Sequence, residues 1–183
     1  MNGIEAFVYG AEFQTQYKFD FLPSIFKNLG IFFNYTYTYS EAFINKRLPA
    51  NYVNSVIIFE NDDLTLYNST IEQEKINLPG QAAHTLNLAI YYETDDFYIK
   101  MSSNYHDAFL YQLGADPDLD VYYDDALHLD LTISYKLNAN TKVFTDFINL
   151  TNAPLKYYLA KPNQIQVQEY YSWWSRIGLK INF

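Results

Sequence analysis

Side-chain character alternates most regularly in the C-terminal stretch Tyr170-Tyr-Ser-Trp-Trp-Ser-Arg-Ile-Gly-Leu-Lys-Ile-Asn-Phe183. One set of alternate positions is largely apolar and has aromatic residues toward its ends: Tyr171, Trp173, Ser175, Ile177, Leu179, Ile181 and Phe183. The other set is more polar: Tyr170, Ser172, Trp174, Arg176, Gly178, Lys180 and Asn182. Successive side chains of a β-strand point to opposite faces. The sequence therefore predicts a strand over residues 170–183 with one apolar and one polar face.

The same period-two pattern recurs in six further segments. These cover residues 9–21, 30–40, 85–92, 97–105, 126–137 and 141–150. In the last segment the faces are mixed, because Asp146 falls on the face of Phe144, Ile148 and Leu150. An assignment of its faces therefore requires a β-bulge. The pattern as a whole predicts an all-β, antiparallel fold of about seven strands.

The strands and their connections predict a transmembrane β-barrel segment. Strands of about 10 residues are long for a soluble sheet and match the length that crosses a bilayer at a tilt. Connections 21–29, 93–96 and 138–140 are short, whereas 40–84, 106–125 and 151–168 are long. Outer-membrane barrels have short periplasmic turns and longer extracellular loops. The alternative is a soluble antiparallel sandwich, which also alternates polar and apolar faces but has no reason to keep every second loop long.

Composition excludes several other classes. Twelve Lys and Arg against 21 Asp and Glu give a formal net charge of −9, which argues against a nucleic-acid binder. The chain has no cysteine and therefore no disulfide or thiolate metal site. Residues 1–5 do not resemble the start of a signal peptide, and the longest apolar runs, such as 56–59, are far too short for a membrane helix.

The strand count raises a question of completeness. Seven is odd, whereas bacterial single-chain barrels have an even number of strands. The first predicted strand would also begin on the extracellular side and the last would end in the periplasm. We therefore expect residues 1–183 to be the C-terminal part of a larger barrel. The alternative is a small eight-stranded outer-membrane barrel with a structural or adhesive role, its eighth strand lying at residues 52–60.

Four stretches resemble a known family. They are Asn34-Tyr-Thr-Tyr-Thr-Tyr-Ser40, Leu78-Pro-Gly-Gln-Ala-Ala-His-Thr-Leu-Asn-Leu88, Val143-Phe-Thr-Asp-Phe-Ile-Asn-Leu-Thr-Asn152 and Glu169-Tyr-Tyr-Ser-Trp-Trp-Ser-Arg-Ile-Gly-Leu-Lys-Ile-Asn-Phe183. Together they resemble the C-terminal barrel portion of TonB-dependent outer-membrane receptors of the Bacteroidetes type. The resemblance implies a barrel of about 22 strands with an N-terminal plug. Residues 1–183 contain no plug domain, so we expect them to form about seven strands of such a barrel.

The resemblance also implies a function. Receptors of this kind import scarce nutrients, such as iron chelates, cobalamin or oligosaccharides, and a TonB-type coupler supplies the energy. The implied partners are outer-membrane lipid, the plug domain, the energy coupler, the barrel assembly machinery and a small-molecule or oligosaccharide ligand. The implied location is the bacterial outer membrane. We expect neither enzymatic activity nor a cofactor, because no nucleophile elbow, phosphate loop or carboxylate dyad stands out.

The terminal strand is a candidate insertion signal. Its residues are Tyr171, Trp173, Ile177, Leu179, Ile181 and Phe183, and the assembly machinery would read them by pairing with the strand's edge. The simpler interpretation is that these side chains face lipid. Aromatic residues elsewhere on the apolar faces fit interfacial girdles. On the polar faces, charged residues are interpreted as plug-facing or water-facing: Arg176, Lys180, Lys136, Asp130, Glu12 and Lys18.

Five tyrosines in the long loops are candidate ligand contacts. They are Tyr111, Tyr122, Tyr123, Tyr157 and Tyr158. Rings in extracellular loops can stack on sugars or planar chelates. The alternative is that the loops pack on themselves.

The loop 116–125 is acidic and resembles a calcium loop in part. However, Val121 and Leu127 stand where an EF-hand has its glycine and glutamate. We therefore interpret this loop as solvated and acidic. His84, His106 and His128 are widely separated and form no close ligand pair, so no metal site is predicted.

Overall fold

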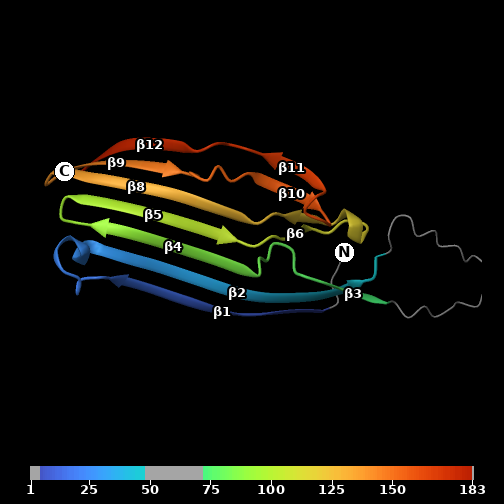
Figure 1. The fold of residues 1–183 in the computed structure, drawn as a ribbon. Helices are drawn as coiled ribbons and strands as arrows, with labels where there is room; N and C mark the ends of the chain where they lie inside the picture. The colour runs from blue at the N-terminus through green and yellow to red at the C-terminus, as the bar shows by residue number, and fades with distance from the viewer. Residues whose placement is uncertain (1–4, 48–71, 183) are drawn as a thin grey trace, which may run out of the picture.

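The structure, a computed structural model, describes residues 5–47 and 72–182. Within these residues the chain is all-β, with two short 3₁₀ helices and two antiparallel sheets (Figure 1). The larger sheet contains β1 (Glu5–Lys18), β2 (Leu29–Asn45), β3 (Gln73–Ile76), β4 (His84–Glu93), β5 (Phe97–His106), β8 (Ala126–Asn138), β9 (Thr141–Ile148) and β12 (Trp174–Ile181). The smaller sheet contains β6 (Phe109–Gln112), β7 (Val121–Tyr123), β10 (Leu155–Leu159) and β11 (Ile165–Glu169). The helices are η1 (Ser24–Asn28) and η2 (Pro117–Leu119).

The larger sheet is a meander of seven strands in the order β1-β2-β4-β5-β8-β9-β12, with β3 paired to β2. The predicted all-β antiparallel fold is confirmed, and each of the seven predicted segments overlaps one of these strands. In the part of the chain described, β1 pairs only with β2, and β12 pairs only with β9, so both edges of the sheet are open. The eighth strand hypothesised at residues 52–60 lies outside the described residues.

None of the helices within residues 5–47 and 72–182 has the length and apolar character that a membrane-spanning helix requires.

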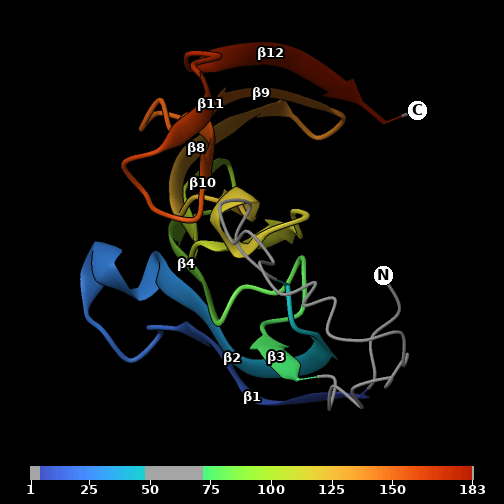
Figure 2. The same ribbon diagram turned by 90° about the vertical axis from the view of Figure 1, so that its right-hand side faces the viewer.

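The sheet is curved, and its strands follow an arc when it is viewed along their direction (Figure 2). A cavity of about 470 Å³ lies against one face and is lined by residues of β1, β2, β4, β5 and β9: Gln16, Phe32, Ala89, Tyr91, Glu93, Tyr98, Lys100 and Lys142. Strands that are not neighbours can line the same cavity only where the sheet curves around it, so this cavity lies on the concave face. The alternate positions predicted to be polar therefore lie on the concave face.

The convex face carries the apolar positions. One cross-strand row on this face runs through Tyr17, Ile31, Ile90, Met101, Leu131 and Phe147. Large apolar side chains remain exposed along it, and Ile177 of β12 is 79% exposed. Exposed apolar surface on one face is typical of proteins whose face meets lipid or another protein.

Two aromatic side chains on the concave face pack over glycines of the neighbouring strand. Tyr91 lies opposite Gly30 and Phe144 lies opposite Gly178, and a Cβ at either glycine would overlap the ring. An aromatic ring over a glycine covers the backbone that the missing side chain leaves exposed. Large rings therefore occupy polar-face positions without disturbing the register.

The faces of β9 are assigned without a bulge at Asp146; the one register shift in its pairing with β8 lies beside the turn, between Lys136 and Asn138. Asp146 pairs in register with Thr132 on one side and Arg176 on the other. The Nε of Arg176 donates to Asp146 Oδ2 at 2.7 Å, and Thr132 Oγ1 donates to Asp146 Oδ1 at 2.8 Å. Asp146 thus lies on the concave face together with Phe144, whose ring fills the space above Gly178. The apolar Phe144 shares the polar face of β9 with Asp146 because its ring covers Gly178, and this packing explains the mixed pattern of the strand.

The predicted terminal strand is shorter than expected. β12 begins at Trp174, so Tyr171 and Trp173 precede it, and Ser172 between them has a positive φ of 64°. The Trp173 ring still contacts Phe147 of β9, with ring centroids 6.4 Å apart. Ile177, Leu179 and Ile181 lie on one face of the strand, as the alternation predicts. Phe183 lies outside the described residues.

Candidate functional site

The smaller sheet is formed from two connections that the sequence analysis treated as loops. β6 and β7 come from the connection between β5 and β8, and β10 and β11 come from the connection between β9 and β12. Their order is β11-β10-β7-β6, so β7 and β10 join the two connections. We call this element the loop sheet. It lies at the end of the larger sheet opposite the short turns (Figure 1).

The loop sheet brings all five candidate tyrosines together. Tyr123 pairs with Tyr157, and Tyr122 pairs with Tyr158 in the same register. The ring of Tyr111 contacts Tyr157 with centroids 5.0 Å apart. Neighbouring residues of a strand point to opposite faces, so the five tyrosines divide into two groups.

One group, Tyr122 and Tyr158, has a packing role. The rings of Tyr122 and Tyr158 stack with centroids 5.4 Å apart and an interplanar angle of 5°. Tyr158 is only 6% exposed, and Leu110 beside Tyr122 is 2% exposed. Burial raises the pKa of both tyrosines. For this pair the structure shows the alternative stated above, a loop that packs on itself.

The other group is accessible at one end. Rings follow one another in the order His106, Tyr123, Tyr157 and Tyr111, with centroid distances of 5.1, 5.0 and 5.0 Å. Phe109 contacts both His106 and Tyr123. Tyr111 at the end of this aromatic row is 52% exposed, whereas Tyr123 and Tyr157 are half-buried. The Tyr111 ring, which already contacts Tyr157, is a surface on which a sugar or planar chelate can stack without ordering new side chains.

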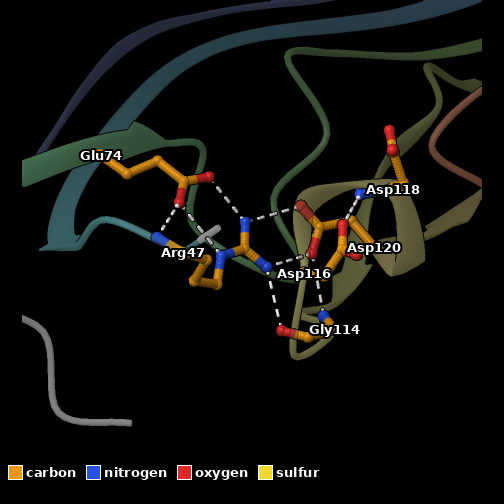
Figure 3. Close-up of polar contacts among 6 residues, drawn as sticks. All are labelled: Arg47, Glu74, Gly114, Asp116, Asp118 and Asp120. Atoms are coloured by element: carbon orange, nitrogen blue, oxygen red, sulfur yellow. Dashed lines mark hydrogen bonds and ion pairs between the residues drawn. The ribbon is translucent and has the colours of Figure 1, made fainter. Parts of the chain in front are cut away.

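A buried ion cluster connects the loop sheet to the end of β2 (Figure 3). Arg47, just beyond β2, has a side chain only 2% exposed and lies between Glu74 of β3 and Asp120. Its Nη2 donates to Glu74 Oε1 at 2.7 Å and to Asp120 Oδ2 at 2.8 Å, while its Nη1 donates to Asp120 Oδ1 and to the carbonyl oxygen of Gly114. Its Nε and backbone N–H both donate to Glu74 Oε2 at 3.1 Å. Every guanidinium nitrogen therefore has a partner.

The hydrogen bonds of the cluster stabilise the charged forms of Arg47 and Glu74. The Arg47 guanidinium keeps the pKa of Glu74 below its ordinary value of 4.5. Asp120 and Glu74 in turn raise the pKa of Arg47 above its already high value, because each accepts hydrogen bonds from the charged form. The Gly114 backbone N–H also donates to Asp120 Oδ1 at 2.8 Å, which fixes the loop between β6 and η2.

The interpretation of 116–125 as a solvated acidic loop is wrong for its buried members. Asp116 and Asp120 are each 6% exposed. Asp116 caps η2 by accepting from the Asp118 backbone N–H at 2.7 Å, and Asp124 forms an ion pair with Lys156 of β10 at 2.6 Å. The carboxylates of this loop thus bind different partners. Within residues 5–47 and 72–182 no group of three or more His, Asp or Glu is arranged to hold a metal ion.

Sequence reasoning missed the cluster, although it found the tyrosines. Arg47 and Asp120 are 73 residues apart, and neither falls in an alternating segment. The sequence offered one indirect signal, which is that the chain has only two arginines. In the structure each forms an ion pair with an aspartate distant in sequence, Arg47 with Asp120 and Arg176 with Asp146. Gly80 of the Leu-Pro-Gly stretch, with φ of 80°, also contacts the loop sheet by donating its N–H to the Leu110 carbonyl at 2.8 Å.

No protein-family model, no curated protein and no solved structure matches this chain.

Proposed function

We propose that this chain forms part of the wall of an outer-membrane transporter that takes up a nutrient with energy from a TonB-type coupler. The observation that carries the proposal is the larger sheet: a curved antiparallel meander with an apolar convex face and a polar concave face. A lipid-facing exterior and a polar interior are what a transmembrane β-barrel requires. Further strands, from the same or another chain, close the open edges of β1 and β12, because lipid provides no hydrogen-bond partners for them.

The loop sheet is the proposed site of ligand capture. It stands at the end with long connections, which is the extracellular end in this class of barrel. Its aromatic row presents the half-exposed ring of Tyr111, and the Arg47 cluster holds the sheet rigidly over the larger sheet. A preformed aromatic surface favours a ligand with flat, weakly polar faces, such as a sugar ring or a planar chelate.

Uptake by cells tests the proposal. A strain that makes the protein is compared with one lacking its gene for binding and uptake of a labelled ferric chelate, cobalamin and a set of oligosaccharides. We expect loss of uptake of one of these classes. An uncoupler of the proton gradient should block that uptake while leaving surface binding intact. Equal uptake of all probes by both strains would contradict the proposed function.

The refolded chain provides a second test, which addresses the alternative of a small complete barrel. If further strands close the edges of β1 and β12, the 183-residue chain alone should not form a heat-resistant, protease-resistant monomer in detergent. Such a monomer would instead support an eight-stranded barrel with a structural or adhesive role.

A further inference from the structure

A histidine and an aspartate meet where the larger sheet passes into the loop sheet. β5 and β6 are separated only by residues 107 and 108, which form one of the links between the two sheets. Asp107 in this link is held against the start of β4, because its backbone N–H donates to the carbonyl oxygen of His84 at 3.0 Å. Its side-chain Oδ1 accepts from the Tyr105 hydroxyl at 2.8 Å. The position of the link therefore depends on the groups that surround Asp107.

The His84 imidazole lies between a phenol and this carboxylate. Its Nδ1 is 2.7 Å from the hydroxyl oxygen of Tyr35 on β2, and its Nε2 is 3.9 Å from Asp107 Oδ2. The imidazole also packs against the rings of Tyr35 and Tyr37, with centroid distances of 5.9 and 5.2 Å. β2 therefore fixes the imidazole on one side, whereas on the other side the distance to Asp107 is longer than that of a hydrogen bond.

The surroundings of the pair favour a positive charge on His84. Titratable side chains around it come from β2, from β5 and from the connections that follow β5 and β7: Tyr35, Tyr37, Tyr105, Asp107 and Asp125. The side chains of His84 and Asp107 are 43% and 28% exposed, so water reaches both. Among the ion pairs of residues 5–47 and 72–182, His84 is the one partner of Asp107.

Protonation changes what the imidazole can donate. A neutral imidazole has one N–H, whereas the imidazolium donates from both ring nitrogens. The imidazolium of His84 can therefore donate from Nδ1 to the Tyr35 oxygen and from Nε2 to Asp107 at the same time. It also attracts the Asp107 carboxylate electrostatically, which the neutral ring does not. Protonation thus strengthens the contact with Asp107 and keeps the contact with Tyr35.

We propose that His84 and Asp107 form a pH-sensitive contact, which fixes the link between the larger sheet and the loop sheet when His84 is protonated. The added proton draws Asp107 toward β4 and restricts the motion of the link and of β6. The aromatic row is affected through the same link, because the ring of His106, next to Asp107, stacks on Tyr123 with centroids 5.1 Å apart. The inference depends on contacts within the chain and requires neither a ligand nor a membrane, so its failure would leave the proposed function untouched.

Amide hydrogen exchange of the purified protein at about pH 5.5 and about pH 8, the range in which histidine changes charge, tests the proposal. Each rate is divided by the intrinsic rate of an unstructured amide at the same pH, so that only protection is compared. Protection of residues 107–112 should be about three-fold higher at the lower pH, which is the size expected of a partly exposed ion pair. Protection of β9, two strands from β5 in the sheet, should be equal at the two pH values. Equal protection of residues 107–112 at both pH values would overturn the proposal.

Three variants identify the source of the rise in protection. His84→Asn removes the imidazole, and Asp107→Asn keeps an acceptor for the Tyr105 hydroxyl but removes the charge, so the rise should be absent from both. His106→Phe is the matched control, because it removes the neighbouring imidazole and keeps an aromatic ring against Tyr123, so the rise should persist. A variant that is only less stable loses protection at both pH values, and the ratio between the two is therefore the quantity compared. Persistence of the rise in His84→Asn or Asp107→Asn, or its loss in His106→Phe, would contradict the proposal.

Discussion

Arg47 and Asp120 lie 73 residues apart in the sequence and form a two-point ion pair in which Nη2 and Oδ2 are 2.8 Å apart. Their side chains are 2% and 8% exposed, so the pair is shielded from water. Because Arg47 also binds Glu74 of β3, one guanidinium connects the end of β2, β3 and the loop sheet. This arrangement gives the loop sheet a fixed position relative to the larger sheet.

Replacement of Arg47 should release the loop sheet. Arg47→Met leaves Glu74 and Asp120 without their counter-ion, and breaking a buried ion pair costs about 3–5 kcal/mol. We expect much faster hydrogen exchange in β6, β7 and β10 and unchanged exchange in β9. The matched control is Lys46→Gln, because the neighbouring Lys46 forms an ion pair with Glu72 in which both side chains are at least half exposed; its effect should stay below about 1 kcal/mol. Equal exchange in both variants would contradict a structural role for the cluster.

Acid should weaken the same contact. The pKa of Glu74 is held below 4.5 in the folded protein, so its contribution to stability is present above about pH 4.5 and is lost as the pH falls through the folded pKa. Protection of the loop sheet from exchange should therefore decrease below pH 4.5 in the unmodified protein. Other carboxylates titrate there too, so the informative quantity is the difference from Arg47→Met, in which this step should be missing. An identical pH profile of exchange protection in the two proteins would show that protonation of Glu74 does not cause the loss of protection.

Two tyrosines of the loop sheet should differ in their effects. If the proposed function is right, Tyr111→Ala, which removes a half-exposed ring, should reduce ligand binding at least ten-fold while changing the free energy of unfolding by less than about 1 kcal/mol. Tyr158→Ala removes a ring that is 6% exposed and should destabilise the loop sheet by about 3 kcal/mol. Ligand binding and hydrogen exchange, measured on both variants, distinguish the roles. If Tyr111→Ala leaves binding of every transported probe unchanged, the aromatic row is not the capture surface.

A charged side chain on the convex face of β12 should be unfavourable. Ile177 is 79% exposed on the apolar face, and an Arg at the bilayer midplane costs about 2–4 kcal/mol. If this face meets lipid as proposed, Ile177→Arg should lower the amount of protein in the outer membrane and its stability there. Lys180→Arg is the control, since it keeps the charge on the concave face of the same strand. A normal yield of Ile177→Arg in the membrane fraction would mean that this face does not meet lipid.

Alternation was sufficient to predict the seven long strands of the larger sheet, because most of them have one apolar and one polar face. It failed in β9, where Phe144 lies on the polar face to cover Gly178, since the glycine that requires the ring lies on another strand. The five strands β3, β6, β7, β10 and β11 were missed, because each has five residues or fewer, which is too short for an alternating pattern to be recognised.

The candidate site was predictable only in part. The five tyrosines were found because ring stacking needs only the residue type and a place in a long loop. Their division into a stacked pair and an accessible row depends on the register of β7 with β10, which pairs residues about 35 positions apart. The Arg47 cluster joins residues up to 73 positions apart, so no local sequence pattern predicts it.

Labelling of single cysteines on intact cells tests the central claim most directly. The chain has no cysteine of its own, and Asp118 in the long connection and Asp95 in a short turn are both exposed. If the larger sheet spans the outer membrane with the loop sheet outside, a membrane-impermeant maleimide should label Asp118→Cys on intact cells. It should label Asp95→Cys only after the outer membrane is permeabilised. Labelling of Asp95→Cys on intact cells as strong as that of Asp118→Cys would contradict the account.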